Sequence, residues 1–254
     1  MTRLFHVESG SGEPVVLVHA IGCDHRMWDS LAEPLARTHR VVRVDVRGHG
    51  ESPVPPGEYS LEALADDVLT VLDGLEIDKA HWVGLSMGGM IGQAFAIAHP
   101  DRLGRLVLAN TTSTYGPEGP KMWEARAKAV RDGGMAAIAE LVMQRYFSDT
   151  FRESHREVVE RFRQRVLSTP AEGYIACCAA IRDLAFTRDL PSIRARTLVI
   201  AGGHDAGTPV AMSQAIADRI VGSQLAVIAE AAHLSAVEAP ETFNALARDF
   251  LTAP

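Results

Sequence analysis

The sequence contains little cysteine, no long apolar run and fewer basic than acidic residues. The three cysteines, of which two are adjacent, have no metal-ligand spacing and are poorly placed for a structural disulfide. No stretch approaches the roughly 18 apolar residues of a membrane helix, and the N-terminal segment lacks the basic and apolar parts of an export signal. We therefore expect a cytoplasmic protein without a membrane partner.

The charge balance disfavours a second class of protein. The 25 Lys and Arg residues are outnumbered by 32 Asp and Glu residues, so the net charge is −7. Proteins that bind nucleic acids need clustered basic side chains to displace counterions, and a nucleic acid partner is therefore disfavoured. The expected partner is a small molecule. The sequence leaves the oligomeric state open.

Six short runs rich in β-branched residues recur along the chain, and helical patterns lie between them. The runs are unbroken rather than alternating, which indicates strands covered on both faces. Alternation of strands with helices, one of them with Ser60 as its N-cap, implies crossover connections and a mostly parallel sheet. The predicted strands cover residues 14–20, 40–46, 80–84, 105–110, 196–202 and 223–229.

One interval interrupts this rhythm. Residues 111–189 contain no comparable strand run but several charged, helix-prone segments. We predict an α/β fold in which a mostly parallel central sheet is flanked by helices. Residues 1–110 and 190–254 form its core, and residues 111–189 form a helical cap inserted over the sheet.

The stretch "VGLSMGGM" places Ser86 among glycines, directly after a predicted strand and before a helix. This context is typical of a nucleophile elbow, a strained turn that lifts a serine hydroxyl above the carboxyl edge of the sheet. Gly84 and Gly88 are expected because the backbones come too close for a Cβ. The N–H of Met87, at the start of the helix, would face a developing oxyanion. A plain glycine-rich turn is the alternative interpretation.

A serine nucleophile needs a base and a group that orients the base. His233 lies in a loop of small residues after the last predicted strand, and Asp205 follows the strand before it. Taken alone, Asp205 reads as a turn or N-cap carboxylate. Together, Ser86, Asp205 and His233 follow three separate strands in the order Ser, Asp, His, which is typical of α/β-hydrolases.

A second oxyanion donor is expected after the first strong strand, in "VHAIGCDHRMW". Ile21 N–H is the candidate, with Gly22 allowing the loop to bend toward Ser86. His19 lies at the end of the strand. This position favours a structural role, in which His19 fixes the loop by a hydrogen bond, and disfavours a role as the catalytic base. Cys23 has no evident base and is disfavoured as a nucleophile.

Over nearly its whole length the chain resembles α/β-hydrolases, most closely the 3-oxoadipate enol-lactonase branch. The resemblance is carried by "VDVRGHGES", "GLSMGGMIGQAFAIAHPDRLGRLVLANT", "LVIAGGHDAGTP" and the terminal "AAHLSAVEAPETFNALARDFL", and in the cap by "MWEARAKAVRDGGM" and "EGYIACCAAIRDLAF". It implies hydrolysis of a small enol-lactone to an oxo acid, without a metal or organic cofactor. His19-Ala20 departs from the Asn-Ser pair usual in that branch and is nearer to general esterases.

Recognition of a carboxylated lactone requires a cation in the pocket. Arg126, one turn after Trp123, and Arg145 are candidates, and Trp123 would supply an apolar wall. A surface arginine and a core tryptophan are the alternative interpretations. Competing functions are a short-chain carboxylesterase, with perhydrolysis as a side activity, and a ligand receptor built on the hydrolase fold.

Overall fold

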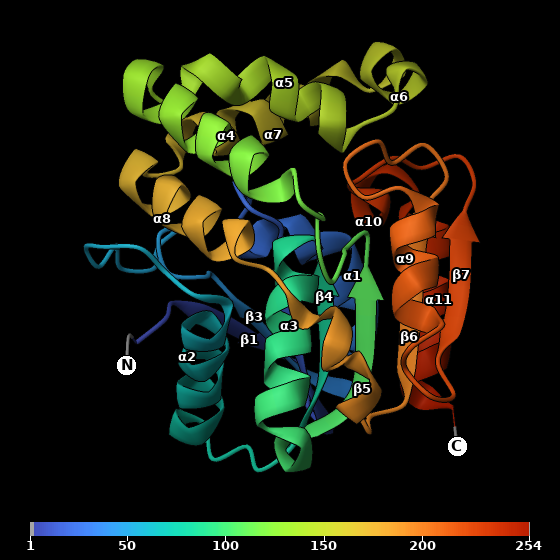
Figure 1. Cartoon of the computed structure of the whole chain (residues 1–254). Helices are drawn as coiled ribbons and strands as arrows, with labels where there is room; N and C mark the ends of the chain where they lie inside the picture. The colour runs from blue at the N-terminus through green and yellow to red at the C-terminus, as the bar shows by residue number, and fades with distance from the viewer. Residues whose placement is uncertain (1–2, 254) are drawn as a thin grey trace.

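The computed structural model describes residues 3–253, whose central feature is a seven-stranded sheet (Figure 1). Its strand order is β1-β3-β2-β4-β5-β6-β7, and only the β1–β3 pairing is antiparallel. The strands are β1 (His6–Ser9), β2 (Glu13–Val18), β3 (His39–Val44), β4 (Ala80–Leu85), β5 (Leu103–Ala109), β6 (Thr197–Gly202) and β7 (Gln224–Ile228).

Helices cover both faces of this sheet. In Figure 1, α2, α3 and α9 lie in front of the strands, while α1 and α11 pack together behind them. The elements flanking the sheet are η1 (His25–Trp28), α1 (Asp29–Leu35), α2 (Leu61–Gly74), α3 (Met87–Ala98), η2 (Pro100–Arg102), α9 (Val210–Ala217), α10 (Ser235–Glu238) and α11 (Pro240–Thr252).

Five further helices, here called the cap helices, lie together above the carboxyl ends of the strands (Figure 1). Within this group α4 packs against α8, and α5 packs against α7. An isolated bridge between Thr114 and Ala185 joins the two connections to the sheet. The cap helices are α4 (Gly119–Gly133), α5 (Ala136–Tyr146), α6 (Asp149–Ser154), α7 (Arg156–Ser168) and α8 (Ala171–Arg182); the short turns η3 (Phe186–Arg188) and η4 (Leu190–Ser192) follow.

The predicted strands and the absence of strands across 111–189 agree with the structure, although the division into two domains stays a prediction. Ser60 caps α2, since its side chain accepts the N–H of Ala63. One expectation is wrong. β7 is not covered on both faces, and Val227 is 47% exposed. β7 lies at the edge of the sheet, where few side chains are available to cover it.

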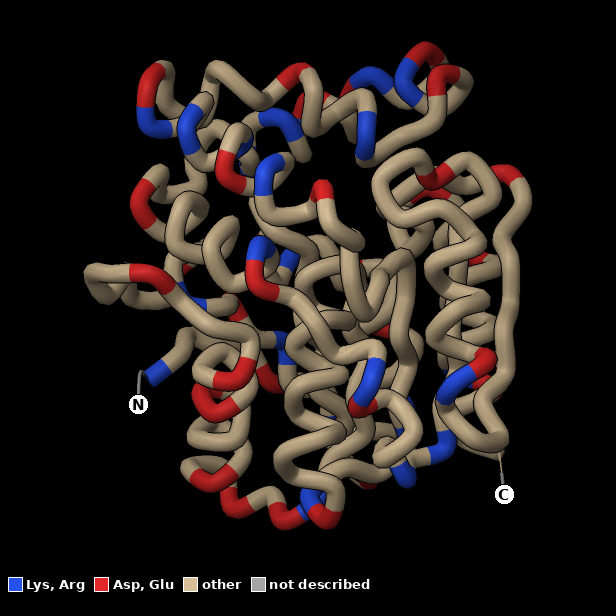
Figure 2. The backbone as a smooth tube through the Cα atoms, in the orientation of Figure 1, with Lys and Arg blue, Asp and Glu red and all other residues tan. Residues whose placement is uncertain are grey.

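Charge is distributed according to burial. In Figure 2 the central strands are mostly tan, while basic and acidic segments are interspersed over the cap helices. Within the described residues no helix is long and apolar enough to cross a membrane.

Candidate active site

Ser86 occupies a sharp turn between β4 and α3. Its φ of 56° and ψ of −116° lie in a region that L-residues rarely adopt. The two flanking glycines permit the turn, because a Cβ on Gly84 would overlap the carbonyl of Gly88, and one on Gly88 would overlap the carbonyl of Val18 in β2. The elbow geometry predicted from the glycines is therefore present.

The side chains of Ser86, His233 and Asp205 form one continuous chain of hydrogen bonds. The distance from His233 Nε2 to Ser86 Oγ is 2.8 Å, and that from His233 Nδ1 to Asp205 Oδ2 is also 2.8 Å. A carboxylate only accepts, so Nδ1–H donates to Asp205 and Nε2 is left to accept the serine proton. All three residues are buried, at the carboxyl edge where β4, β6 and β7 end.

Asp205 is saturated with hydrogen-bond donors. Oδ1 accepts from the backbone N–H groups of Gly207 (2.8 Å) and Thr208 (2.9 Å), and Oδ2 accepts from the Thr208 hydroxyl (2.7 Å) as well as from His233. Burial alone would raise the pKa of this carboxyl, but the charge and hydrogen bond of His233, together with the Thr208 donors, lower the pKa to about 2. Asp205 is therefore ionised at neutral pH.

Asn110, which the sequence analysis missed, completes this network. Its Nδ2 donates to Asp205 Oδ2 (3.0 Å) and to the carbonyl of Ala232 (3.1 Å), next to His233. The Ser235 hydroxyl donates to Asn110 Oδ1. Asn110 has a φ of 46°, which asparagine tolerates better than most residues. The available signal was an asparagine directly after a buried apolar strand.

The two residues predicted to supply oxyanion donors lie near Ser86: Met87 is the next residue in the chain, and Ile21 lines the same cavity. Met87 begins α3, where a helix leaves its first N–H groups free. Ile21 lies in the loop between β2 and η1, here called the β2 loop (residues 19–24). The Ala20 carbonyl accepts from Cys23 N–H (3.1 Å) and from His19 Nδ1–H (2.8 Å), so the Ile21 N–H of the same peptide group points the opposite way. His19 thus fixes the loop, as predicted.

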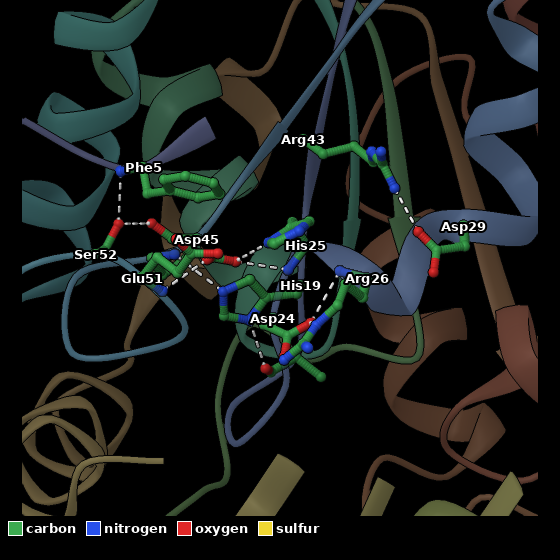
Figure 3. A network of polar contacts seen from close by, with 12 residues as sticks. Phe5, His19, Asp24, His25, Arg26, Asp29, Arg43, Asp45, Glu51 and Ser52 are labelled. Carbon is green, nitrogen blue, oxygen red and sulfur yellow. Dashed lines mark hydrogen bonds and ion pairs between the residues drawn. The ribbon is translucent and has the colours of Figure 1, made fainter. Parts of the chain in front are cut away.

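Further polar contacts anchor the β2 loop at both ends (Figure 3). At its start, His19 Nε2 accepts the N–H of Val46 (2.9 Å). Beyond its end, buried Asp45 accepts from His25 N–H (2.6 Å) and Nδ1 (3.0 Å), and from the N–H of Glu51 (2.9 Å). The loop therefore has a fixed shape.

Cys23 has the wrong environment for a nucleophile. Its thiol is buried, and burial raises its pKa to about 12. The reactive thiolate is therefore scarce at neutral pH.

The structure brings the three predicted cap residues into the same small cavity as Ser86 and His233. This cavity has a volume of about 20 Å³ and is lined by Ile21, Ser86, Tyr115, Trp123, Arg126, Arg145, Tyr146, Gly207 and His233. A larger surface hollow of about 780 Å³ beside α7 contains none of these residues. The candidate site is therefore the small cavity between the cap helices and the sheet.

Arg126 is held between two aromatic rings of the cap. Its guanidinium carbon lies 5.2 Å from the centre of the Trp123 ring and 5.7 Å from that of Tyr174. Arg126 Nε and Trp123 Nε1 are both buried and have no hydrogen-bond partner. Two N–H donors at the cavity are thus unpaired.

Arg145 provides a second cation. It is half-buried, its Nη2 lies 3.8 Å from the Met122 sulfur, and its Nε is close to Gly207. In the part of the chain that the structure describes, neither Arg145 nor Arg126 forms an ion pair. The cavity therefore carries two positive charges that no protein carboxylate neutralises.

Within residues 3–253, one group of side chains has metal-ligand spacing, namely Glu13, His39 and His81. It lies at the start of β2, β3 and β4, at the opposite edge of the sheet from Ser86. His81 Nδ1 accepts the N–H of Arg105 (2.9 Å), so the proton of the neutral ring sits on Nε2, which faces Glu13. A metal would need that nitrogen unprotonated, so these residues fit a metal poorly.

Comparison with known proteins agrees with this geometry. Residues 13–240 match the family described as the alpha/beta hydrolase fold. The chain belongs to this family. It is 37% identical over 230 residues to 3-oxoadipate enol-lactonase 2 of Acinetobacter baylyi. The aligned region covers 91% of this chain and 85% of that protein.

Solved structures extend the similarity to nearly the whole chain. The enol-lactonase from Burkholderia xenovorans LB400 superposes with a TM-score of 0.95 at 36% identity, covering 98% of this chain and 96% of that one. A thermophilic esterase from Thermogutta terrifontis, with malate bound, has a TM-score of 0.93 at 37% identity, covering 98% and 92%. Family and relatives confirm the prediction of an α/β-hydrolase of the ester and lactone class.

Proposed function

We propose that this α/β-hydrolase is a serine hydrolase that opens a small lactone bearing a carboxylate, with a 3-oxoadipate enol-lactone as the preferred substrate type. The observation that carries the proposal is the position of two unpaired arginines in the same cavity as the hydrogen-bonded Ser86, His233 and Asp205. Enol-lactonases among the relatives support the substrate class.

In the first step, Ser86 Oγ attacks the lactone carbonyl while His233 Nε2 takes the serine proton. Asp205 holds the imidazole orientation and stabilises the imidazolium. The N–H groups of Ile21 and Met87 stabilise the oxyanion, and removal of one such donor typically costs about 10²- to 10³-fold in rate. The C–O bond of the ring then breaks, and His233 protonates the departing enol oxygen.

In the second step, water attacks the acyl-enzyme. His233 takes a proton from the water, the tetrahedral intermediate collapses, and Ser86 Oγ leaves with that proton. The released enol rearranges to a ketone, so the product is an oxo acid. No group outside the chain and water is needed to balance the reaction.

The cap side of the cavity supports recognition of a carboxylate. Arg126 Nε–H and Trp123 Nε1–H are unpaired donors, and charge-assisted hydrogen bonds to a carboxylate are the strongest partners available to them. Malate in the related esterase is also a carboxylate. A cavity of about 20 Å³ holds little more than one water, so groups that line the cavity have to move when a lactone binds.

A panel of three substrates tests the proposal by their kcat/KM values. The enol-lactone of 3-oxoadipate is compared with α-angelica lactone, which has the same ring without the carboxylate, and with p-nitrophenyl acetate. We expect the carboxylated lactone to be preferred by at least about tenfold, as one charge-assisted hydrogen bond would give. Equal values for the two lactones would overturn the substrate class.

A short-chain carboxylesterase is the second candidate, favoured by His19-Ala20 and by the similarity to an esterase. It predicts that p-nitrophenyl acetate is the best substrate of the panel. A ligand receptor would complete only one or a few slow turnovers. A cytoplasmic location belongs to the same proposal, since Cys23, Cys177 and Cys178 are all free thiols.

A further inference from the structure

We propose that Tyr146, at the end of cap helix α5, is a positioning residue that sets both the β2 loop and the His233 imidazole for the reaction proposed above. The inference rests on that proposed function. It concerns a residue with no obvious chemical role, and it makes the cap part of the oxyanion site as well as part of the substrate pocket.

The first contact is with the peptide group that joins Ile21 to Gly22. The Tyr146 hydroxyl donates to the Ile21 carbonyl on one side of this group. On the other side, the Gly22 N–H donates to His49 Nε2 (2.9 Å). One peptide group is therefore held from both ends, by a tyrosine from the cap and a histidine from the loop after β3.

The local turn explains why this peptide group needs holding. Cys23 N–H donates to the Ala20 carbonyl, and Gly22 has a φ of 74° in the third position of the turn, as type II turns require. The competing type I turn differs by a reversal of the Ile21–Gly22 peptide group. Such a reversal changes ψ of Ile21 and φ of Gly22, so it would turn the Ile21 carbonyl and the Gly22 N–H away from their present partners and change the path of the loop that carries the Ile21 N–H.

The second contact is with His233. The Tyr146 and His233 rings stack at a centroid distance of 6.0 Å with 20° between their planes. The backbone N–H of Leu234, the next residue, donates to the Tyr146 carbonyl (2.9 Å). The ring and the backbone carbonyl of Tyr146 thus contact the loop of His233, the proposed base. The hydroxyl of Tyr146 contacts the β2 loop, which carries the Ile21 N–H.

Tyr146 and His49, the two side chains that hold the Ile21–Gly22 peptide group, keep a constant protonation state. Burial raises the pKa of the Tyr146 hydroxyl well above 10, so it remains a donor. Burial lowers the pKa of His49 to about 3, so its Nε2 lone pair remains an acceptor at neutral pH. The geometry of the Ile21–Gly22 peptide group is therefore insensitive to pH over the working range of the enzyme.

The test is Tyr146→Phe, which removes the hydroxyl and keeps the ring. Butylboronic acid serves as the probe, because its boron bonds to Ser86 Oγ and directs one boron hydroxyl at the oxyanion donors. Tyr59→Phe is the matched control. The Tyr59 hydroxyl also donates to a backbone carbonyl, that of Pro55 (2.8 Å), and Tyr59 also lies under the cap, where its N–H donates to Ala176, away from Ser86.

In Tyr146→Phe we expect the Ki of butylboronic acid to rise by about tenfold and kcat to fall by about tenfold, while KM changes by less than about twofold. This pattern indicates the loss of an interaction that stabilises the transition state and not the bound substrate. Tyr59→Phe should change thermal stability without changing Ki. An unchanged Ki and kcat in Tyr146→Phe, or an equal change in both variants, overturns the inference. If the unsubstituted enzyme does not bind the boronic acid, or if Ser86→Ala remains active, the proposed serine mechanism itself fails and the inference falls with it.

Discussion

The two sides of the candidate cavity differ in how their polar atoms are paired. On the sheet side, Asp205 accepts five hydrogen bonds, and Asn110 uses both its amide nitrogen and its oxygen. On the cap side, the buried N–H groups of Arg126 and Trp123 have no partner. The polar side chains of Asp205 and Asn110 are fully paired without a ligand, whereas two side chains on the cap side have buried N–H groups that lack an acceptor.

This difference has opposite consequences for stability. A saturated network keeps the reacting groups in place and also stabilises the fold. A buried donor without a partner costs about 1 to 3 kcal/mol, which the fold bears until an acceptor binds. Substitutions on the two sides are therefore expected to change stability in opposite directions, and this makes the comparison testable.

The largest effect is expected from removal of the proposed nucleophile on the sheet side. Ser86→Ala should lower kcat by about 10⁴-fold or more, because the remaining groups have no nucleophile to activate. Thermal unfolding should change little, since alanine keeps the backbone of the elbow. Retention of more than a small percentage of the activity, measured with the preferred lactone, would contradict the serine mechanism.

Arg126→Met tests the cap side. Loss of a charge-assisted hydrogen bond should raise the KM of the carboxylated lactone by about 10- to 100-fold. The KM of α-angelica lactone should not change. Because an unpaired buried donor is removed, the Tm should stay constant or rise.

A matched control exists in the same cap. Arg152, on α6, forms an ion pair with Asp149 (2.5 Å) and, like Arg126, has a buried Nε without a hydrogen-bond partner, but it does not line the cavity. Arg152→Met therefore removes a comparable arginine away from the candidate site. It should leave both KM values unchanged. A lower Tm in Arg126→Met than in Arg152→Met would show that Arg126 is a structural residue, and the comparison between the two sides would fail.

The parts of the site that could be predicted from sequence are those that a local pattern determines. The glycines around Ser86 are required by close backbone contacts, with the Val18 carbonyl among them, and such contacts leave a signature in the sequence. Asp205 and His233 were found because each follows a strand, and parallel strands end at one edge of the sheet. Pattern and topology together were sufficient to predict that Ser86, Asp205 and His233 lie side by side.

The parts that could not be predicted depend on contacts distant in sequence. Asn110 bonds to Asp205, which lies 95 positions further along the chain, and the Tyr146 hydroxyl bonds to a carbonyl 125 positions before it. A single asparagine or tyrosine after an apolar run has many ordinary interpretations. The pairing state of Arg126 likewise depends on which carboxylates the fold places nearby, and composition does not contain that information.

Asn110→Ala sharpens the comparison from the sheet side. It leaves the Ala232 carbonyl and one lone pair of Asp205 without a donor, so we expect a destabilisation of about 1 to 3 kcal/mol. With roughly 2 to 4 °C per kcal/mol for a chain of this size, the Tm should fall measurably. The kcat should fall by about tenfold with little change in KM. A Tm that rises, as expected for Arg126→Met, would remove the distinction between the two sides.

The smallest effect is a pH dependence of stability that arises from the rigid β2 loop. Burial lowers the pKa of both His19 and His49, in the latter from 6.5 to about 3. Between these values the unfolded chain binds a proton that the folded chain does not. The free energy of unfolding therefore falls as pH decreases below 6.5, by up to about 1.4 kcal/mol per pH unit for each such group.

Urea unfolding between about pH 6.5 and 5 measures the histidine contribution to this slope, because the carboxyl groups of the unfolded chain titrate mainly below that range. Burial also lowers the pKa of His39 and His81, so a His49 variant is needed to assign a part of the slope to His49. His49→Gln keeps an acceptor for the Gly22 N–H and removes the titration, so the slope of stability against pH should become shallower by up to about 1.4 kcal/mol per pH unit. His155→Gln, at an exposed cap position, should keep the original slope. Equal slopes in the unsubstituted protein, His49→Gln and His155→Gln would mean that His49 takes up a proton in the folded state. The β2 loop would then be less rigid than we infer for the sheet side of the cavity.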